Sequence, residues 1–297
     1  MGINLSAIER ACRTILAGAG LYVRPDFLII GAQKAGTTAL HHYLSGHPRL
    51  VPAGMKEVGY FSPDVFSRWT AHPHYDQMLK LAENWDDPAT LRRGRRWYHA
   101  QFPMYRARRG KLFFEATPEY LPIPDSPGRI FAYRPDMKLI VLLRDPVARA
   151  YSAWNMFRNF SGEIYEDLRE KRSFEAAVGE ELERLASTPV GNGTAYLRRG
   201  LYHRHLQRYL DIFPRDSLLI LEHRAFEEDI AGTLDKTCQF IGVEPFENDR
   251  QWAPEFVGNY ESGLTPQTYT MLADFFAPHN EELFTLIGER FDHWGVR

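Results

Sequence analysis

Residues 26–48 read DFLIIGAQKAGTTALHHYLSGHP. The apolar run after Asp26 predicts a buried strand, because strands of parallel sheets are covered on both faces. A loop with two glycines follows at 31–38, and the pattern after it predicts a helix that ends at Gly46 and Pro48. The stretch therefore predicts a strand, a glycine-containing loop and a helix in succession.

Apolar runs and helical patterns alternate along the rest of the chain. Further strands are predicted at the short apolar runs 111–115, 138–143 and 217–221. Helices are predicted from Pro146 onward and at 202–213, 230–241, 266–276 and 279–288. This alternation predicts an α/β fold, in which a central parallel sheet carries helices on both faces.

No repeat or linker divides the sequence, so we expect a single domain over residues 1–297. Residues 1–24 are expected to form an N-terminal arm or helix. Residues 155–195 are polar and contain Gly191-Asn192-Gly193. We expect this stretch to be a surface excursion or a lid, with a solvated helix and loop as the plainer interpretation.

Composition excludes several classes of partner. The formal net charge of −2 does not favour nucleic acid, so any basic site is local. The two cysteines, Cys12 and Cys238, lie far apart and favour a reducing compartment over a disulfide. The histidines form no cluster with metal-ligand spacing, so we expect no metal. No run is long and apolar enough to predict an integral membrane segment.

The loop at 31–38 has the groups that bind a phosphate or a sulfate. A helix that starts after a buried strand directs N–H groups and partial positive charge at one point. The glycines let the backbone approach a ligand, the lysine adds a charge, and two threonines add hydroxyl donors. The loop is not a Walker A motif, because its lysine precedes the second glycine and no Lys-Ser/Thr pair follows. The alternative is a tight turn that binds nothing. The candidate anion-binding residues are Lys34, Ala35, Gly36, Thr37 and Thr38.

A second candidate anion site follows the strand at 138–143. Arg144 ends this strand, and Ser152 lies eight residues later on the next predicted helix. Ligands of open α/β sheets bind beyond the carboxyl ends of the strands, where the loop at 31–38 also lies. An arginine there suits a second phosphate, with an ion pair to Asp145 or a nearby glutamate as the alternative.

These two sites, in this order, resemble those of sulfotransferases that use 3′-phosphoadenosine 5′-phosphosulfate (PAPS). The likeness is to the heparan sulfate type, such as the glucosaminyl 3-O-sulfotransferases and the sulfotransferase half of the N-deacetylase/N-sulfotransferases. It runs from about Pro25 to Trp294 and is carried by FLIIGAQKAGTTAL, KEVGYF and LIVLLRDPVARAYSAW, with RRGLYHRHLQRYLDIFP and FFAPHNEELFTLIGERFDHW matching in pattern. The resemblance implies a P-loop-like nucleotide-binding fold, PAPS as donor, 3′-phosphoadenosine 5′-phosphate (PAP) as product, and a bacterial member of the family.

The resemblance also implies roles for individual residues. Glu57 corresponds to the catalytic glutamate, and Lys34 serves both catalysis and donor binding. The segment Lys34–Thr38 corresponds to the 5′-phosphosulfate loop, and Arg144 with Ser152 to the 3′-phosphate element. Further nucleotide contacts are expected from Tyr202, Gly258, Asn259 and Tyr260.

The sequence departs from the family pattern at two places. Ala116 stands where the animal 3-O-sulfotransferases carry a lysine, and VGNYE at 257–261 lacks the basic residues of their nucleotide loop. These departures leave the acceptor open: a glycan, a lipid or a small molecule, with either a hydroxyl or an amine as nucleophile.

The residues expected to face the acceptor are Lys56, Trp154 and Phe157. For the two aromatic residues, packing in the core is the alternative. An arginine-rich run at 91–111 could hold an anionic or sugar acceptor, but a solvated face with aromatic residues beneath it is the favoured interpretation.

Two other functions stay open at this point. A nucleotide or small-molecule kinase is disfavoured by the missing Gly-Lys-Ser/Thr, and a non-catalytic nucleotide- or glycan-binding module is disfavoured by the presence of Lys34 and Glu57. The absence of a membrane anchor and the Met1 start favour a cytoplasmic enzyme. The oligomeric state is not predicted.

Overall fold

The computed structural model describes residues 5–69, 74–103, 110–187, 194–247, 252–253 and 264–295. Within them, one parallel sheet has the strand order β2-β3-β1-β4-β5. The strands are β1 Phe27–Gly31, β2 Leu50–Pro52, β3 Leu112–Ala116, β4 Lys138–Leu143 and β5 Leu218–Glu222. The predicted α/β fold is confirmed.

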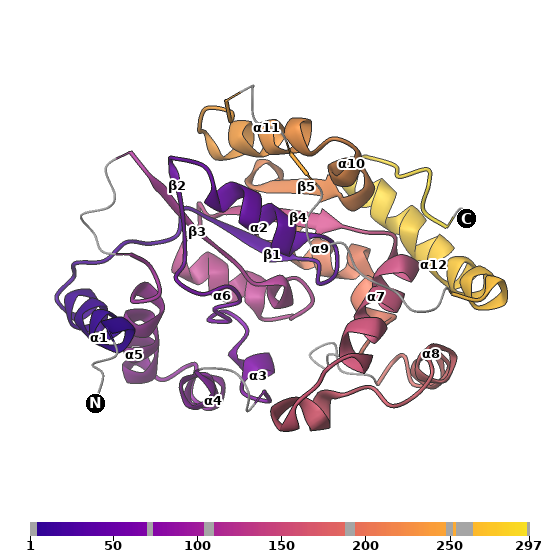
Figure 1. Ribbon diagram of the computed structural model, residues 1–297, viewed down its shortest axis with the longest axis horizontal. Coiled ribbons are helices and arrows are strands. Elements are labelled where there is room, and N and C mark those ends of the chain that lie inside the picture. The colour runs from indigo at the N-terminus through magenta and orange to yellow at the C-terminus, as the bar shows by residue number, and fades with distance from the viewer. Residues whose placement is uncertain are drawn as a thin grey trace.

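Strand β1 lies at the centre of the sheet and is buried throughout, as its apolar sequence predicts. Phe27 is opposite Phe114 of β3 on one side and Lys138 of β4 on the other. Helices cover both faces of the sheet, with α10 and α11 above the strands and α6 below them in Figure 1.

The helices surround the sheet and extend beyond its carboxyl ends. The α-helices are α1 Leu5–Gly18, α2 Thr37–Ser45, α3 Pro63–Phe66, α4 Tyr75–Glu83, α5 Pro88–His99, α6 Ser126–Tyr133, α7 Pro146–Arg158, α8 Phe174–Glu183, α9 Tyr202–Leu210, α10 His223–Glu228, α11 Ile230–Ile241 and α12 Pro266–Ile287. Short 3₁₀ helices occur at η2 Pro118–Tyr120, η3 Glu163–Leu168, η4 Arg198–Gly200 and η5 Arg215–Ser217. None of these described helices combines the length and the apolar character needed to cross a bilayer.

Two predicted helices, at 266–276 and 279–288, are one continuous helix in the structure. Helix α12 passes through Pro278, so the prediction of a break there is wrong. A proline inside a helix removes one hydrogen bond. Buried side chains occur on both sides of it, including Leu272 and Phe276 before it and Leu283 after it. Packing of these residues holds both halves in one helix, which local propensity alone does not predict.

A second, smaller core lies beyond the sheet and joins α7, α8 and α12. Trp154 and Phe157 of α7 pack there with Phe174 and Val178 of α8 and with Phe276 of α12. The described part of residues 155–195 therefore contributes buried side chains as well as exposed ones. Its function as a lid stays a prediction.

The N-terminal segment forms α1, which lies beside α5 at the edge of the molecule farthest from α12 in Figure 1. Gly18 lies at the end of α1. A Cβ atom at this position would be 3.9 Å from the Arg96 side chain of α5. Of the stretch 1–24 predicted to be an arm or a helix, Leu5–Gly18 is helical.

Candidate active site

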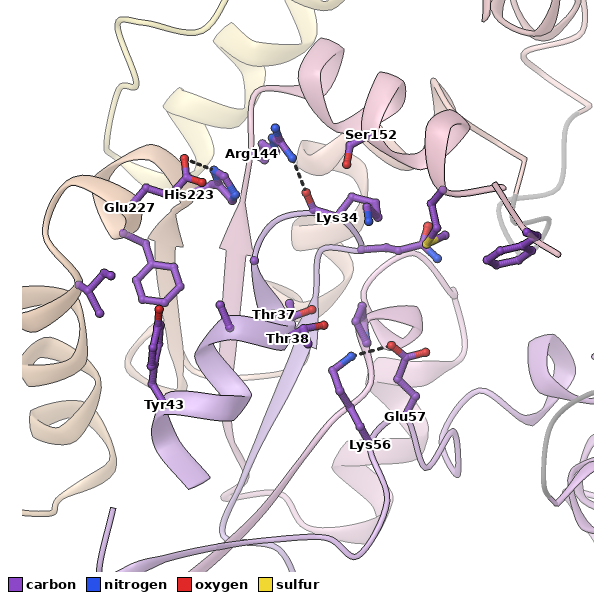
Figure 2. A pocket seen from close by; sticks show the side chains of 18 of the residues that line it. Lys34, Thr37, Thr38, Tyr43, Lys56, Glu57, Arg144, Ser152, His223 and Glu227 are labelled. Atoms are coloured by element: carbon purple, nitrogen blue, oxygen red, sulfur yellow. Dashed lines mark hydrogen bonds and ion pairs between the residues drawn. The ribbon is translucent and has the colours of Figure 1, made fainter. Parts of the chain in front are cut away.

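A cavity of about 470 Å³ lies beyond the carboxyl ends of β1 and β4, between α2, α7 and α10. Figure 2 shows Thr37 and Thr38 at the start of α2, between Arg144 on one side and the pair Lys56 and Glu57 on the other. The predicted site residues that line this cavity are Lys34, Gly36, Thr37, Thr38, Lys56, Glu57, Arg144 and Ser152.

The loop before α2 bends back at two residues with positive φ. Lys34 has φ 69° and Gly36 has φ 91°. A Cβ atom at Gly36 would lie 3.2 Å from the His223 ring, so both the backbone and the space favour glycine there. Gly36 caps α2, and Thr37, Thr38 and Ala39 of the first turn line the cavity, at the helix end where free N–H groups and partial positive charge are found.

Arg144 and Ser152 approach the loop from β4 and α7. The Arg144 guanidinium donates from Nη1 to the Lys34 carbonyl oxygen at 3.1 Å. Asp145 caps α7 by accepting from the Ala148 N–H at 2.8 Å and also accepts from the Gly295 N–H at 3.0 Å. Both oxygens of the Asp145 carboxylate, the alternative ion-pair partner of Arg144, therefore accept hydrogen bonds from backbone N–H groups.

Tyr202 and Ala35 are buried behind the cavity and are not among the residues that line it. The Tyr202 hydroxyl donates to the Arg144 carbonyl oxygen at 2.9 Å, and the Ala35 N–H donates to the Ala32 carbonyl oxygen at 3.1 Å. Their expected contribution to nucleotide binding stays a prediction. Tyr202 holds the backbone at the end of β4, and Ala35 forms the turn.

Glu57 also has a positive φ, of 61°, and its N–H donates to the Ala116 carbonyl oxygen at 2.9 Å. Its carboxylate is 2.7 Å from the Lys56 ammonium. Both side chains are partly exposed to the cavity, at 37% for Glu57 and 24% for Lys56. Glu57 thus forms an ion pair with its neighbour in the sequence, and its side chain still lines the cavity.

A buried carboxylate supports the segment that carries Glu57. Glu115 accepts hydrogen bonds from the hydroxyls of Tyr98 at 3.0 Å, Tyr120 at 2.7 Å and Thr117 at 2.6 Å. The Thr117 oxygen in turn accepts from the Gly59 N–H at 3.3 Å. Burial raises the pKa of Glu115, while the three hydroxyls favour its charged form. This network fixes the backbone beside Glu57.

A second buried group supports the loop at 31–38. Glu119 and Arg199, which are 2% and 3% exposed, form an ion pair with a hydrogen bond of 2.8 Å. Gln33 donates to Glu119 at 3.1 Å and accepts from Arg199 at 3.0 Å. Because Gln33 lines the cavity, this group ties the loop to η2 and η4 through one side chain.

Sequence reasoning missed the residues that β5 and α10 bring to the cavity. His223 lies 3.2 Å from Glu227, and burial, with a smaller contribution from Arg144, lowers the pKa of His223 to about 3. Phe226 and Ile230 line the cavity beside Tyr43 of α2. No local motif marks these residues, since only the pairing of β5 with β4 places them here.

Trp154 and Phe157 do not line the cavity. They are 7% and 1% exposed and belong to the core shared by α7, α8 and α12, so the packing alternative is correct for both. Met156 and Phe160 line the cavity in their place. Spacings of four and eight residues from Ser152 place these two on the Ser152 side of α7, and this signal was present in the sequence.

Three predicted nucleotide contacts, Gly258, Asn259 and Tyr260, lie outside the described residues, as do residues 104–109 of the arginine-rich run. Within the described part of that run, Arg93 donates to Thr90 at 3.0 Å and Arg96 packs near Gly18. Neither of them lines the cavity.

Among the described residues, the group that could hold a metal ion is His203, His279 and Glu282. One ligand atom from each lies within 4.8 Å of the others, and His203 Nε2 is 2.8 Å from Glu282. The three residues come from α9 and α12 and do not line the cavity described above. The expectation that the reaction needs no metal stays a prediction.

Comparison with known proteins identifies the family. Residues 24–255 match the model of the sulfotransferase domain. The mouse heparan sulfate glucosamine 3-O-sulfotransferase 3B1 is 25% identical over 300 residues, covering 94% of this chain and 67% of that enzyme. The human bifunctional heparan sulfate N-deacetylase/N-sulfotransferase 2 is 26% identical over 292 residues, covering 89% of this chain and 29% of that enzyme.

A solved structure supports the same conclusion. The sulfotransferase from Alicyclobacillus acidocaldarius superposes with a TM-score of 0.66 at 29% identity, covering 92% of this chain and 99% of that one. The match of the family model spans more than half of the chain and includes the loop at 31–38, Glu57 and Arg144. The chain therefore belongs to the sulfotransferase family and is a PAPS-dependent sulfotransferase.

Proposed function

We propose that this enzyme transfers the sulfuryl group of PAPS directly to a hydroxyl or amine, with Glu57 as general base and with Lys34, Thr37, Thr38, Arg144 and Ser152 holding the donor. The observation that carries the proposal is that all of these residues line one cavity. Two cations, three hydroxyls and a helix N-terminus form a set of groups that suits a doubly phosphorylated nucleotide.

Each end of the donor has its own group of residues. Lys34 and the first turn of α2 are proposed to hold the 5′-phosphosulfate, since they combine a full charge with backbone N–H groups. Arg144 and Ser152 are proposed to hold the 3′-phosphate. The hydrogen bond from Arg144 to the Lys34 carbonyl keeps the two groups at a fixed separation.

Glu57 lines the same cavity as Lys34 and is proposed to take the proton of the acceptor nucleophile. Bound PAPS supplies an activated sulfuryl group and a phosphate leaving group. Lys34 and the hydroxyls of Thr37 and Thr38 stabilise the charge that develops there, and the rigid cavity keeps nucleophile and leaving group in line. Lys56, which is paired with Glu57, orients the carboxylate.

The test is a thermal shift experiment with PAP, ATP and ADP on the wild-type protein. A ligand that binds only the folded state stabilises it by about 2.7 kcal/mol at 100 times its Kd. We expect PAP to raise the melting temperature, ATP and ADP to have little effect, and Lys34→Ala with Arg144→Ala to abolish the PAP effect. A stronger effect of ATP would favour a kinase and contradict the proposal.

A matched control removes two cations elsewhere. Lys236 is exposed on α11, and Arg290 forms an exposed ion pair with Glu281. Lys236→Ala with Arg290→Ala changes the net charge by the same amount and should leave the PAP effect unchanged, because neither residue lines the cavity and exposed charges are largely screened.

A further inference from the structure

Resting on the proposed function, we infer from the cavity wall that the acceptor is an uncharged alcohol or phenol with an apolar body, and not an anionic sugar chain. Four apolar residues, Trp69, Pro118, Met156 and Phe160, line the same cavity as Glu57 and Ser152 and are called its apolar wall below. None of these side chains carries a charge or a strong hydrogen-bond acceptor. They therefore define the chemistry that the acceptor must present.

The α7 side of this wall continues the face that carries Ser152. Met156 lies one helical turn beyond Ser152, and Phe160 lies about one turn further, just after α7 ends. The Phe160 ring contacts the ring of the buried Phe157 at 5.1 Å between centroids and the ring of Tyr165 at 5.1 Å. These two ring contacts hold the Phe160 side chain, which is half-buried at the cavity.

The other two residues of the wall, Trp69 and Pro118, follow α3 and β3 in the chain. Trp69 lies after α3, where its ring contacts the buried Phe66 at 5.9 Å between centroids. Pro118 follows β3, whose last residue, Ala116, accepts the hydrogen bond from the Glu57 N–H. Apolar groups from three separate parts of the chain therefore line the cavity that holds the proposed base.

Few positive charges among the described lining residues are available to bind an anionic acceptor. The cations among the described lining residues are Lys34, Lys56 and Arg144, and His223 is neutral because burial lowers its pKa to about 3. Lys34 and Arg144 face the proposed donor phosphates, and Lys56 is 2.7 Å from Glu57. A carboxylate or sulfate of an acceptor would have to lose water beside an apolar wall and beside the Glu57 carboxylate, which is costly.

The proposed reaction is balanced with such an acceptor. The acceptor O–H gives its proton to Glu57, the acceptor oxygen forms a bond to sulfur, and the bond between sulfur and the 5′-phosphate oxygen breaks. The electron pair of that bond leaves with PAP. The products are an aryl or alkyl sulfate, PAP and one proton, with no change of oxidation state.

The test measures PAP release and sulfated product with PAPS and three acceptors: 2-naphthol, 1-decanol and N-sulfated heparosan. The first two separate an aromatic from an aliphatic body, and the third is a polyanionic sugar chain. We expect kcat/KM for 2-naphthol or 1-decanol to exceed that for N-sulfated heparosan by about tenfold or more, the range that apolar pocket contacts give. Preferred sulfation of the polyanion would overturn the inference.

Variants of the wall give a second measurement. Met156→Ala and Phe160→Ala should raise the KM for the apolar acceptor by about tenfold. Met271→Ala and Phe131→Ala remove exposed side chains of the same types from other surfaces and should leave KM unchanged. An unchanged KM in both wall variants would contradict the inference.

The thermal shift with PAP separates the two levels of proposal. A protein that binds PAP but sulfates neither apolar alcohol contradicts the acceptor assignment alone. A protein that PAP does not stabilise contradicts the proposed function itself. In each wall variant, an unchanged PAP shift also shows that the protein is folded and that its donor site is intact.

Discussion

Lys34 and Glu57 share a backbone conformation that residues with a side chain rarely adopt. They are the non-glycine residues with positive φ in the described part of the chain, at 69° and 61°. Such a conformation costs about 1–3 kcal/mol and persists only where the surroundings hold it. Here the hydrogen bonds from Arg144 to the Lys34 carbonyl and from the Glu57 N–H to Ala116 hold it.

Replacing the proposed base tests the residue scale directly. Glu57→Gln should lower kcat by about 10²–10⁴-fold, the usual contribution of a positioned general base, and leave the affinity for PAP nearly unchanged. The measurement is steady-state transfer from PAPS together with the PAP thermal shift. Glu227→Gln is the matched control, because Glu227 lines the same cavity and has no role in the proposed proton transfer. Equal losses in the two variants would exclude Glu57 as the base.

Individual site residues were predictable where a motif places them at the end of a strand. The loop at 31–38 and Arg144 follow buried strands, so parallel pairing of β1 with β4 brings them together. The positive φ of Glu57 and the approach of His223 depend on contacts between distant segments, which no local pattern encodes. For α7, the residues that face the cavity follow from counting turns from Ser152, and Trp154 and Phe157 lie on the other side.

At the scale of the elements, β1, β3, β4 and β5 were predicted to within one residue because buried parallel strands appear as uninterrupted apolar runs. Strand β2, Leu50–Pro52, was missed since three residues carry too little pattern. Helix α12 was divided in error at Pro278, because the packing that keeps it continuous comes from α7 and α9. Local signals therefore identify elements well and fail where tertiary packing overrides them.

Asp145 caps the N-terminus of α7, and a substitution can remove this cap. Asp145→Ala removes the acceptor of the Ala148 and Gly295 N–H groups and should cost about 1 kcal/mol. We expect the melting temperature to fall by roughly 2–4 °C. Asp145→Asn keeps a side-chain oxygen at the cap and should lose less. A melting temperature that is the same for Asp145→Ala as for the wild type would show that the cap contributes nothing.

For the whole molecule, buried histidines predict how stability changes with pH. Burial lowers the pKa of His99 and His223 to about 3 and that of His41 and His203 to about 4, from 6.5. Between about pH 6.5 and 4 the unfolded chain therefore binds more protons than the folded protein. The contribution of these histidines to the free energy of unfolding is fully present above pH 6.5. It is lost as the pH falls towards 4, by up to about 1.4 kcal/mol per pH unit for each histidine.

Urea unfolding at pH 7.5, 6.5 and 5.5 checks this prediction. The urea midpoint should fall between pH 6.5 and 5.5 and change less between 7.5 and 6.5. His99→Asn should make the urea midpoint depend less steeply on pH, since the unfolded state then binds one proton fewer relative to the folded state. His42→Asn, at an exposed histidine, is the control and should leave the slope as it is. A midpoint independent of pH down to 5.5 would refute the prediction.

The central place of β1 also has a consequence for the synthesis of the chain. Both of its neighbours, β3 and β4, come later in the sequence, so Phe27–Gly31 leaves the ribosome long before either partner exists. Until residues 112–143 follow, a wholly apolar segment has two unpaired edges and two uncovered faces, which is the state in which strands aggregate. We therefore expect chaperones to bind the nascent chain during that interval. A truncated product that ends before β3 should be insoluble.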